Sequence, residues 1–290
     1  AASILSKAKF PVILSGAGVV IGNAIEECKI LAEKLDAPVC NGYQHNDSFP
    51  GSHPLAVGPL GYNGSKAAMQ LISKADVVLA LGTRLNPFST LPGYGIDYWP
   101  KNATIIQVDM NPDRIGLTKK VTVGICGDCK MVAKQISEKL STDAGNNGRE
   151  ERKNLIHKTK SAWLQTLTGL DHEEDDPGTV WNKEARERDK DRMSPRQAWR
   201  AIQEAIPSGA IISSDIGNNC AIGNAYPTFE KGRKYLAPGL FGPCGYGFPS
   251  ILGAKIGCPE TPVIGFAGDG AFGISMNEMS SCARKEWPAI

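Results

Sequence analysis

The sequence predicts an α/β protein built from two doubly wound domains, each a parallel sheet with helices on both faces. Two features of the chain indicate this architecture. Short apolar segments alternate with segments of helical periodicity over residues 9–140, and the same alternation resumes at residue 193. Strands of a parallel sheet are buried on both faces, so they appear as continuous apolar runs, and helices connect them. The predicted units are therefore residues 1–140, a charged connection over 141–192, and residues 193–290.

The first unit contains five short segments that we expect to form parallel strands. They cover residues 10–14, 37–40, 76–81, 104–109 and 121–126. The expected helices cover residues 24–35, 65–73 and 131–140. In the first of these helices, apolar residues recur on one face, as they do in a helix that packs against a sheet.

The second unit begins with a clear helix start. Ser194 suits the cap position and Pro195 the first helical position. Further along, residues 210–214 and 262–267 are expected strands, and a helix is expected over residues 250–257. A second parallel sheet is the consequence.

The connection over residues 141–192 differs from both units. It is rich in charge, and we expect one helix in it, with few apolar side chains able to pack: Ala162, Trp163, Leu164, Leu167 and Leu170. Residues 171–176 form an acidic run. This run lacks the glycine and the spaced ligands of a calcium loop, which favours a solvated surface over a metal site.

Composition excludes several classes of function. The chain has 290 residues, of which 41% are hydrophobic, and a net charge of +2. A balanced charge gives no electrostatic reason to expect nucleic acid or an anionic membrane as partner. No apolar run approaches the roughly 20 residues needed to cross a bilayer. The chain starts at Ala1 and stops at Ile290, where a strand is expected to begin, so we expect a piece of a longer protein.

Eight cysteines are scattered through the chain. A protein of this size does not need disulfides for its core, so free thiols in a reducing cytoplasm are expected. Cys126 and Cys129 form a Cys-x-x-Cys pair. A zinc site would require a second pair; a redox pair remains open, beside the simpler interpretation of a strand end followed by a helix that Asp128 caps.

Two glycine-bearing turns follow apolar strands. The first holds Gly16, Gly18 and Gly22. It approaches a dinucleotide-binding fingerprint, but its third glycine is displaced by one position and no acidic residue ends a second strand. Nucleotide binding and a tight turn packed against the sheet both remain open for it.

The second turn is Gly268-Asp269-Gly270, at the end of a fully apolar strand. Open α/β sheets bind ligands at this end of their strands. Glycines let phosphate oxygens approach the backbone, and the amides that follow can donate to them. A carboxylate at the same place makes sense if Mg²⁺ lies between it and the phosphate oxygens.

Together with other motifs along the chain, this turn resembles those of the thiamine-diphosphate enzymes of the acetolactate-synthase type. In the second unit the resemblance rests on residues 214–219, 242–249 and 268–272. In the first unit it rests on residues 49–55, 81–84 and 108–112. These motifs span nearly the whole chain outside the charged connection. The resemblance implies an enzyme with thiamine diphosphate and Mg²⁺ as cofactors.

A narrower resemblance, to one branch of this family, is carried by residues 213–254 and 265–279 and by the connection around residues 170–179. It implies an acetyltransferase that converts sulfoacetaldehyde and phosphate to acetyl phosphate and sulfite. Acetolactate synthase or another relative that decarboxylates 2-oxo acids is the alternative. A non-catalytic nucleotide-binding α/β protein is the alternative from a different class, although such a protein has no use for the carboxylate of Asp269.

The resemblance also assigns roles to individual positions. Those implied to bind cofactor are Gly217, Asn218, Asn219, Gly242, Cys244, Gly268, Asp269, Gly270 and Ala271. Asp269 resembles the first Mg²⁺ ligand of the family. Cys244 stands where relatives use a backbone carbonyl to accept from the cofactor's 4′-amino group. Its thiol has no basic neighbour in the sequence, so we expect it to pack and not to act as a nucleophile.

Some parts of such an enzyme are expected outside this chain. The family's catalytic glutamate lies in an amino-terminal domain, and its second metal ligand, an asparagine, follows beyond Ile290. The family also implies a homodimer or homotetramer, with the active site between two subunits. Arg84 and Arg233 are cations available for a phosphate acceptor, although such residues are more often surface charges.

Overall fold

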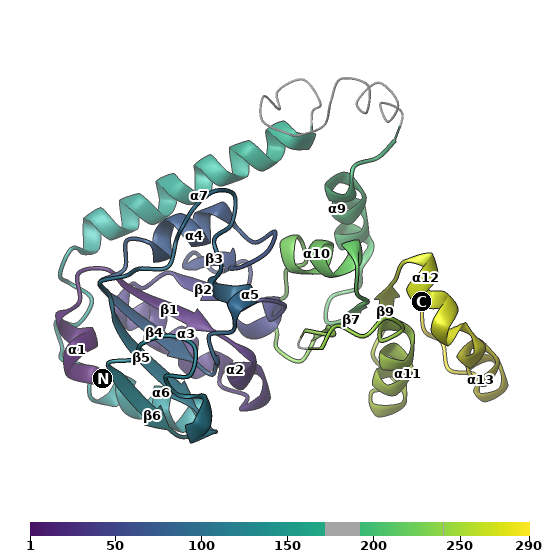
Figure 1. The fold of residues 1–290 in the computed structure, drawn as a ribbon, viewed down its shortest axis with the longest axis horizontal. Helices are drawn as coiled ribbons and strands as arrows, with labels where there is room; N and C mark the ends of the chain where they lie inside the picture. The colour runs from purple at the N-terminus through teal and green to yellow at the C-terminus, as the bar shows by residue number, and fades with distance from the viewer. Residues whose placement is uncertain (172–191, 240) are drawn as a thin grey trace.

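A computed structural model describes residues 1–171, 192–239 and 241–290, and the first unit contains a six-stranded parallel sheet (Figure 1). Its strands are β1 Pro11–Ser15, β2 Val39–Asn41, β3 Ala56–Pro59, β4 Val77–Leu81, β5 Thr104–Asp109 and β6 Val123–Cys126. The order in the sheet is β3-β2-β1-β4-β5-β6, with every pair parallel. This is the strand order of a doubly wound dinucleotide-binding fold, so the predicted fold class is confirmed.

Helices lie on both faces of this sheet. They are α1 Ala2–Lys7, α2 Ala17–Ile21, α3 Ile25–Leu35, α4 Lys66–Ile72, α5 Pro87–Thr90 and α6 Cys129–Glu138, with the 3₁₀ turns η1 Asn46–Ser48 and η2 Pro112–Arg114. Alternate residues of β1 divide between the two cores. Ile13 packs in the cluster with α3 and α6, while Val12 and Leu14 pack in the cluster with α4. This period of two is what a strand covered on both faces requires.

Strand β3 is the one strand of this sheet that the sequence did not predict. It contains Gly58, whose φ is +93°, and ends at Pro59, and the β2–β3 pairing has an irregular register next to Val39. Glycine and proline are poor strand residues and mark irregular or edge positions. At the edge of the sheet this segment therefore pairs without the apolar run that identifies the central strands.

The second unit has a smaller parallel sheet in the order β8-β7-β9. Its strands are β7 Ile211–Ser214, β8 Tyr235–Leu236 and β9 Val263–Phe266. The helices are α9 Pro195–Ala205, α10 Asn218–Ala225, α11 Gly247–Gly257, α12 Asp269–Ser275 and α13 Met279–Lys285, with η3 Met276–Glu278. Ser194 caps α9, as expected, and it also forms a capping box with Gln197. At the free edge of β9, Ile290 donates to the Val263 carbonyl and accepts from the Gly265 amide.

Helix α7, Arg149–Asp171, runs along the first unit beside α4 (Figure 1). The prediction of which side chains of this helix pack was partly wrong, because Leu164 is 61% exposed and Ala162 is also exposed. Among residues 149–168 of this helix, the buried ones are Arg152, Ile156 and Thr159, which lie one to three turns earlier. The helix packs through its first half, where it buries one apolar residue and one arginine and has no apolar stripe. Apolar periodicity therefore did not predict this contact. The acidic run lies outside the described residues except for Asp171.

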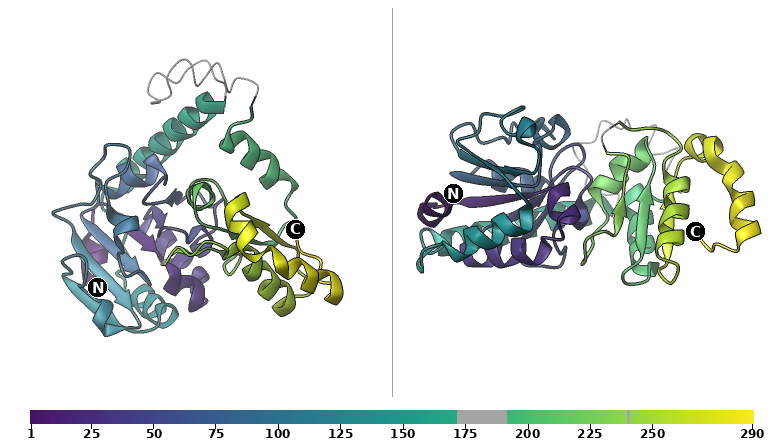
Figure 2. Two further views of the ribbon diagram at one scale, coloured as in Figure 1. Left: turned by 45° about the vertical axis from the view of Figure 1, so that its right-hand side comes forward. Right: turned by 90° about the horizontal axis from the view of Figure 1, so that it is seen from below.

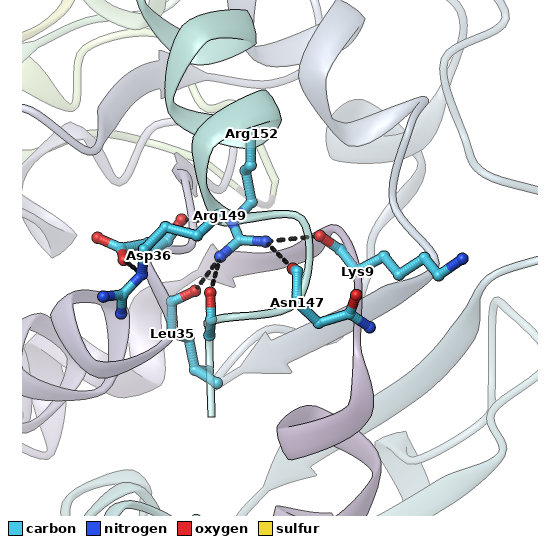
Figure 3. Close-up of polar contacts among 7 residues, drawn as sticks. Lys9, Leu35, Asp36, Asn147, Arg149 and Arg152 are labelled. Atoms are coloured by element: carbon cyan, nitrogen blue, oxygen red, sulfur yellow. Dashed lines mark hydrogen bonds and ion pairs between the residues drawn. The ribbon is translucent and has the colours of Figure 1, made fainter. Parts of the chain in front are cut away.

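Arg152 joins α7 to the first unit although it is only 1% exposed. Its five N–H groups donate to five backbone carbonyls, those of Lys9, Leu35, Asp36, Gly145 and Asn147 (Figure 3). Leu35 and Asp36 lie at the carboxyl end of α3, where carbonyls have no intrahelical donor. A cation there is also favoured by the helix dipole.

All eight cysteines are free thiols, Cys126 exposed and Cys129 buried. Asp128 caps α6 by accepting from the amides of Lys130 and Met131, as the simpler interpretation of that segment predicted. Burial raises the pKa of the Cys129 thiol to about 12, which disfavours the thiolate that redox exchange requires. Across residues 1–171, 192–239 and 241–290, no helix combines the length and the apolarity needed to span a bilayer.

Candidate functional site

The carboxyl ends of β7 and β9 are neighbours in the second sheet, because these strands pair in parallel. The chain leaves β7 through Asp215 and turns at Gly217 into α10. Gly217 has φ 91° and ψ −147°, a conformation that only glycine adopts readily, and it caps α10. The chain leaves β9 and enters α12 at Asp269, with Gly268 as the cap. Two helix starts therefore lie at one edge of the sheet.

Asp215 holds a third segment at this edge. Its side chain is 1% exposed and accepts three backbone amides. Oδ1 accepts from Ile216 at 2.7 Å and from Gly245 at 3.1 Å, and Oδ2 accepts from Gly247 at 2.6 Å. The loop over residues 242–247 is thereby tied to the end of β7. The motif over residues 214–219 includes Asp215 but did not predict this role; an acidic residue directly after a buried strand was the available signal.

Close approaches show that the predicted positions gather in one place. A Cβ on Gly268 would lie 3.3 Å from Nδ2 of Asn219. A Cβ on Gly245 would lie 3.5 Å from the carbonyl oxygen of Ala271 and closer still to Ile274. Three segments far apart in the sequence, 217–219, 242–247 and 268–271, are therefore adjacent in the structure.

The amino end of α12 offers hydrogen-bond donors to an anion. The first helical bond runs from the Phe272 amide to the Gly268 carbonyl, so the amides of Asp269, Gly270 and Ala271 precede the helical ladder. Asp269 and Gly270 are exposed, and a Cβ on Gly270 would meet nothing within 4 Å. An anion can reach these amides through the open space over Gly270.

The residues present fit Mg²⁺ only as part of a larger ligand set. Asp269 supplies one carboxylate, and the part of the chain that the structure describes holds no cluster of three or more His, Cys, Asp or Glu able to bind a metal. Mg²⁺ is commonly held by one or two carboxylates together with phosphate oxygens and water. Asp269 beside a phosphate-binding helix start meets that requirement for one ligand.

The prediction that the Cys244 side chain packs against the protein was wrong. Its side chain is exposed and does not pack. Gly242 and Gly245, on either side of it, have positive φ values of 67° and 84°. Cys244 is therefore accessible from solvent in the described chain.

The first unit has its own cavity at the carboxyl ends of β1, β4 and β5, with a volume of about 550 Å³. Gly18, Gly22 and Arg84 are among the residues that line it. The Gly16 turn is tightly packed, since a Cβ on Gly16 would lie 2.6 Å from the Gly82 carbonyl oxygen. The turn thus packs closely against the sheet and also borders a cavity. Arg233, in contrast, donates to carbonyls at the end of α2.

The two parallel sheets and this glycine-lined edge are typical of a cofactor-binding α/β protein. Residues 1–136 match the family described as "Thiamine pyrophosphate enzyme, central domain", and residues 215–290 match "Thiamine pyrophosphate enzyme, C-terminal TPP binding domain". The chain belongs to this family. All nine predicted site residues lie within the second match.

Within this family, the chain is more similar to some relatives than to others. Over all 290 residues the chain is 78% identical to the "Probable sulfoacetaldehyde acetyltransferase" of Rhizobium meliloti (strain 1021), of which it covers 49%. It is 73% identical to the "Sulfoacetaldehyde acetyltransferase" of Roseovarius nubinhibens, of which it covers 48%. Identity to the "Probable acetolactate synthase large subunit" of Methanococcus aeolicus is 29%, with 47% of that protein covered. The chain spans about half the length of the curated relatives it matches.

Proposed function

We propose that the full-length protein to which this chain belongs is a thiamine-diphosphate- and Mg²⁺-dependent acetyltransferase that converts sulfoacetaldehyde and phosphate to acetyl phosphate and sulfite. The observation that carries the proposal is the 78% identity over the whole chain to a relative of that name. The probable acetolactate synthase large subunit of Methanococcus aeolicus matches far less well, at 29% identity. The reaction breaks a carbon–sulfur bond and forms a carbon–oxygen bond to phosphate, and it needs no external oxidant.

The chain's own residues would hold the diphosphate end of the cofactor. The amides of residues 269–271 at the start of α12 would donate to the diphosphate, and the α10 start at Gly217 lies at the same edge of the sheet. The Asp269 carboxylate would bind Mg²⁺ together with diphosphate oxygens. Asp215 would keep the loop that carries Cys244 in place beside them.

When bound, thiamine diphosphate supplies the carbanion chemistry of the reaction. The described residues would provide binding and orientation, with amide donors facing the diphosphate charge and one carboxylate binding the Mg²⁺ beside it. The glutamate that activates the cofactor and the second metal ligand are proposed to come from parts of the protein outside this chain. A homodimeric or homotetrameric enzyme in the cytoplasm completes the proposal.

The experiment uses the full-length protein with thiamine diphosphate and Mg²⁺. Sulfoacetaldehyde or pyruvate is supplied with and without phosphate, and sulfite, acetyl phosphate and acetolactate are measured. We expect sulfite and acetyl phosphate from sulfoacetaldehyde only when phosphate is present. Acetolactate from pyruvate, without sulfite from sulfoacetaldehyde, would assign the protein to the acetolactate synthases instead. The Asp269→Ala variant serves as the matched control for cofactor-dependent turnover.

A further inference from the structure

A buried side-chain amide of helix α10 is hydrogen-bonded to the first unit. Asn224, near the end of this helix, is 0% exposed. Its Oδ1 accepts from the Gln44 amide at 2.8 Å, and its Nδ2 donates to the carbonyls of Leu60 at 3.3 Å and Tyr62 at 2.9 Å. Both N–H groups and the carbonyl oxygen of this side chain are therefore used, and all three partners belong to the first unit.

Asn46 of the first unit caps the same helix end. Its Nδ2 lies 2.9 Å from the carbonyl oxygen of Pro227, 3.1 Å from that of Asn224 and 3.4 Å from that of Gly223. The last carbonyls of a helix have no intrahelical donor. A side chain from another domain supplies one here, with 5% of its own surface exposed.

A third contact lies one turn closer to the start of α10. The Cys220 thiol is hydrogen-bonded to the Tyr43 hydroxyl at 3.0 Å and to the Gln44 side-chain amide. Apart from the carbonyls of Leu60 and Tyr62, the first-unit groups in these three contacts come from one short segment, 43–46, that follows β2. Figure 2 shows the two units side by side.

The opposite end of α10 carries the predicted diphosphate loop. Asn219 lies against Gly268, and Gly217 caps the helix. An α-helix rises about 1.5 Å per residue, so Asn219 and Asn224 are separated by only about 7–8 Å along the axis. A short helix moves as one body. A change at the carboxyl end of α10, which contacts the first unit, therefore changes the position of its amino end relative to α12.

We infer that Asn224 and Asn46 are positioning residues that fix α10 for binding of the cofactor's diphosphate, an inference that rests on the proposed function. Neither residue lies at the site itself. Both act through α10, which joins the first unit to the cofactor edge of the second sheet. The first unit thereby takes part in cofactor binding without touching the cofactor through these two side chains.

A matched control separates positioning from general stability. Gln107 on β5 is 1% exposed and also makes three hydrogen bonds to the backbone. It donates to the carbonyls of Thr83 and Arg114 and accepts from the Gly116 amide. It has the same amide chemistry and burial as Asn224, but it contacts no residue of α10 in these bonds. Asn224→Asp and Gln107→Glu each replace an N–H donor pair by an oxygen that faces two carbonyls.

The test is calorimetric titration of thiamine diphosphate, with Mg²⁺ present, into the full-length wild type and both variants, together with their melting temperatures. We expect both variants to melt earlier. We expect Asn224→Asp to raise the cofactor Kd at least about tenfold, the size of effect typical of lost supporting contacts, and Gln107→Glu to change it less than about twofold.

A Kd for Asn224→Asp within twofold of wild type, or equal increases in both variants, would overturn the inference while leaving the proposed function intact. If Asn224→Asp does not fold, Asn46→Ala decides by the same thresholds, because it removes the cap without altering α10. Absence of thiamine diphosphate binding by the wild type would instead overturn the proposed function, and the inference with it.

Discussion

Replacing Arg152 by methionine should be among the most destabilising changes available in the first unit. The substitution keeps most of the unbranched stem and removes the guanidinium, whose five N–H groups serve five carbonyls (Figure 3). Burial lowers the pKa of this guanidinium, and the nearby Asp36 carboxylate opposes that shift. The buried cation is therefore compensated mainly by backbone dipoles.

The magnitude follows from these contacts. A buried carbonyl that loses its donor costs about 1–3 kcal/mol. Water can enter the space and reach some of the five carbonyls, and removal of the charge also removes its own desolvation cost. The net loss should then be about 3–5 kcal/mol, well below the sum of the costs of five unsatisfied carbonyls. Arg152→Lys should lie between wild type and methionine, because an ammonium has three donors.

Urea unfolding of the full-length protein, followed by circular dichroism, measures the loss. Arg149→Met is the matched control on the same helix: the Arg149 side chain is 36% exposed and pairs with Asp36. This partly exposed pair should contribute only about 1 kcal/mol, well below the loss expected for Arg152. Equal effects of the two methionine variants, or a loss below about 1 kcal/mol for Arg152→Met, would refute the reasoning.

Three further perturbations test other parts of the molecule. Asp269→Ala should abolish Mg²⁺-dependent binding of thiamine diphosphate in calorimetry, because the diphosphate charge loses its anchored cation; affinity equal to wild type would rule out this ligand. Burial, followed by the charge of Arg84, lowers the pKa of His45 from 6.5 to about 4. The stability that the neutral ring provides is therefore complete above pH 6.5 and lost as the pH falls toward 4. Between pH 7 and pH 5, wild type should lose about 1–2 kcal/mol more than His45→Gln in urea unfolding, and parallel pH profiles would contradict this. Gly223→Ala should destabilise by about 1–3 kcal/mol, since its Cβ would lie 2.1 Å from the Tyr235 hydroxyl. Gly253→Ala, with nothing within 4 Å, should be neutral or stabilising by up to about 1 kcal/mol. Melting temperatures that fall equally would refute the distinction between these two glycines.

The sequence by itself determined the fold class and the central strands. β1, β4 and β5 are buried on both faces, so each appears as an apolar run whatever its neighbours are. It also determined the chemistry available at the Gly268–Gly270 turn, because glycine and carboxylate after a strand are local properties. Capping residues such as Ser194 were predictable for the same reason: the group they satisfy lies two or three residues away.

Only the tertiary structure decided which distant segments hold the candidate site together. Asp215 binds the amides of Gly245 and Gly247, and Asn224 binds groups more than 160 residues earlier in the chain. The partners in these contacts are backbone amides and carbonyls, which every residue carries, so no sequence pattern marks them. Arg152 is buried for the same reason: its partners are five carbonyls that only the folded chain brings to one point.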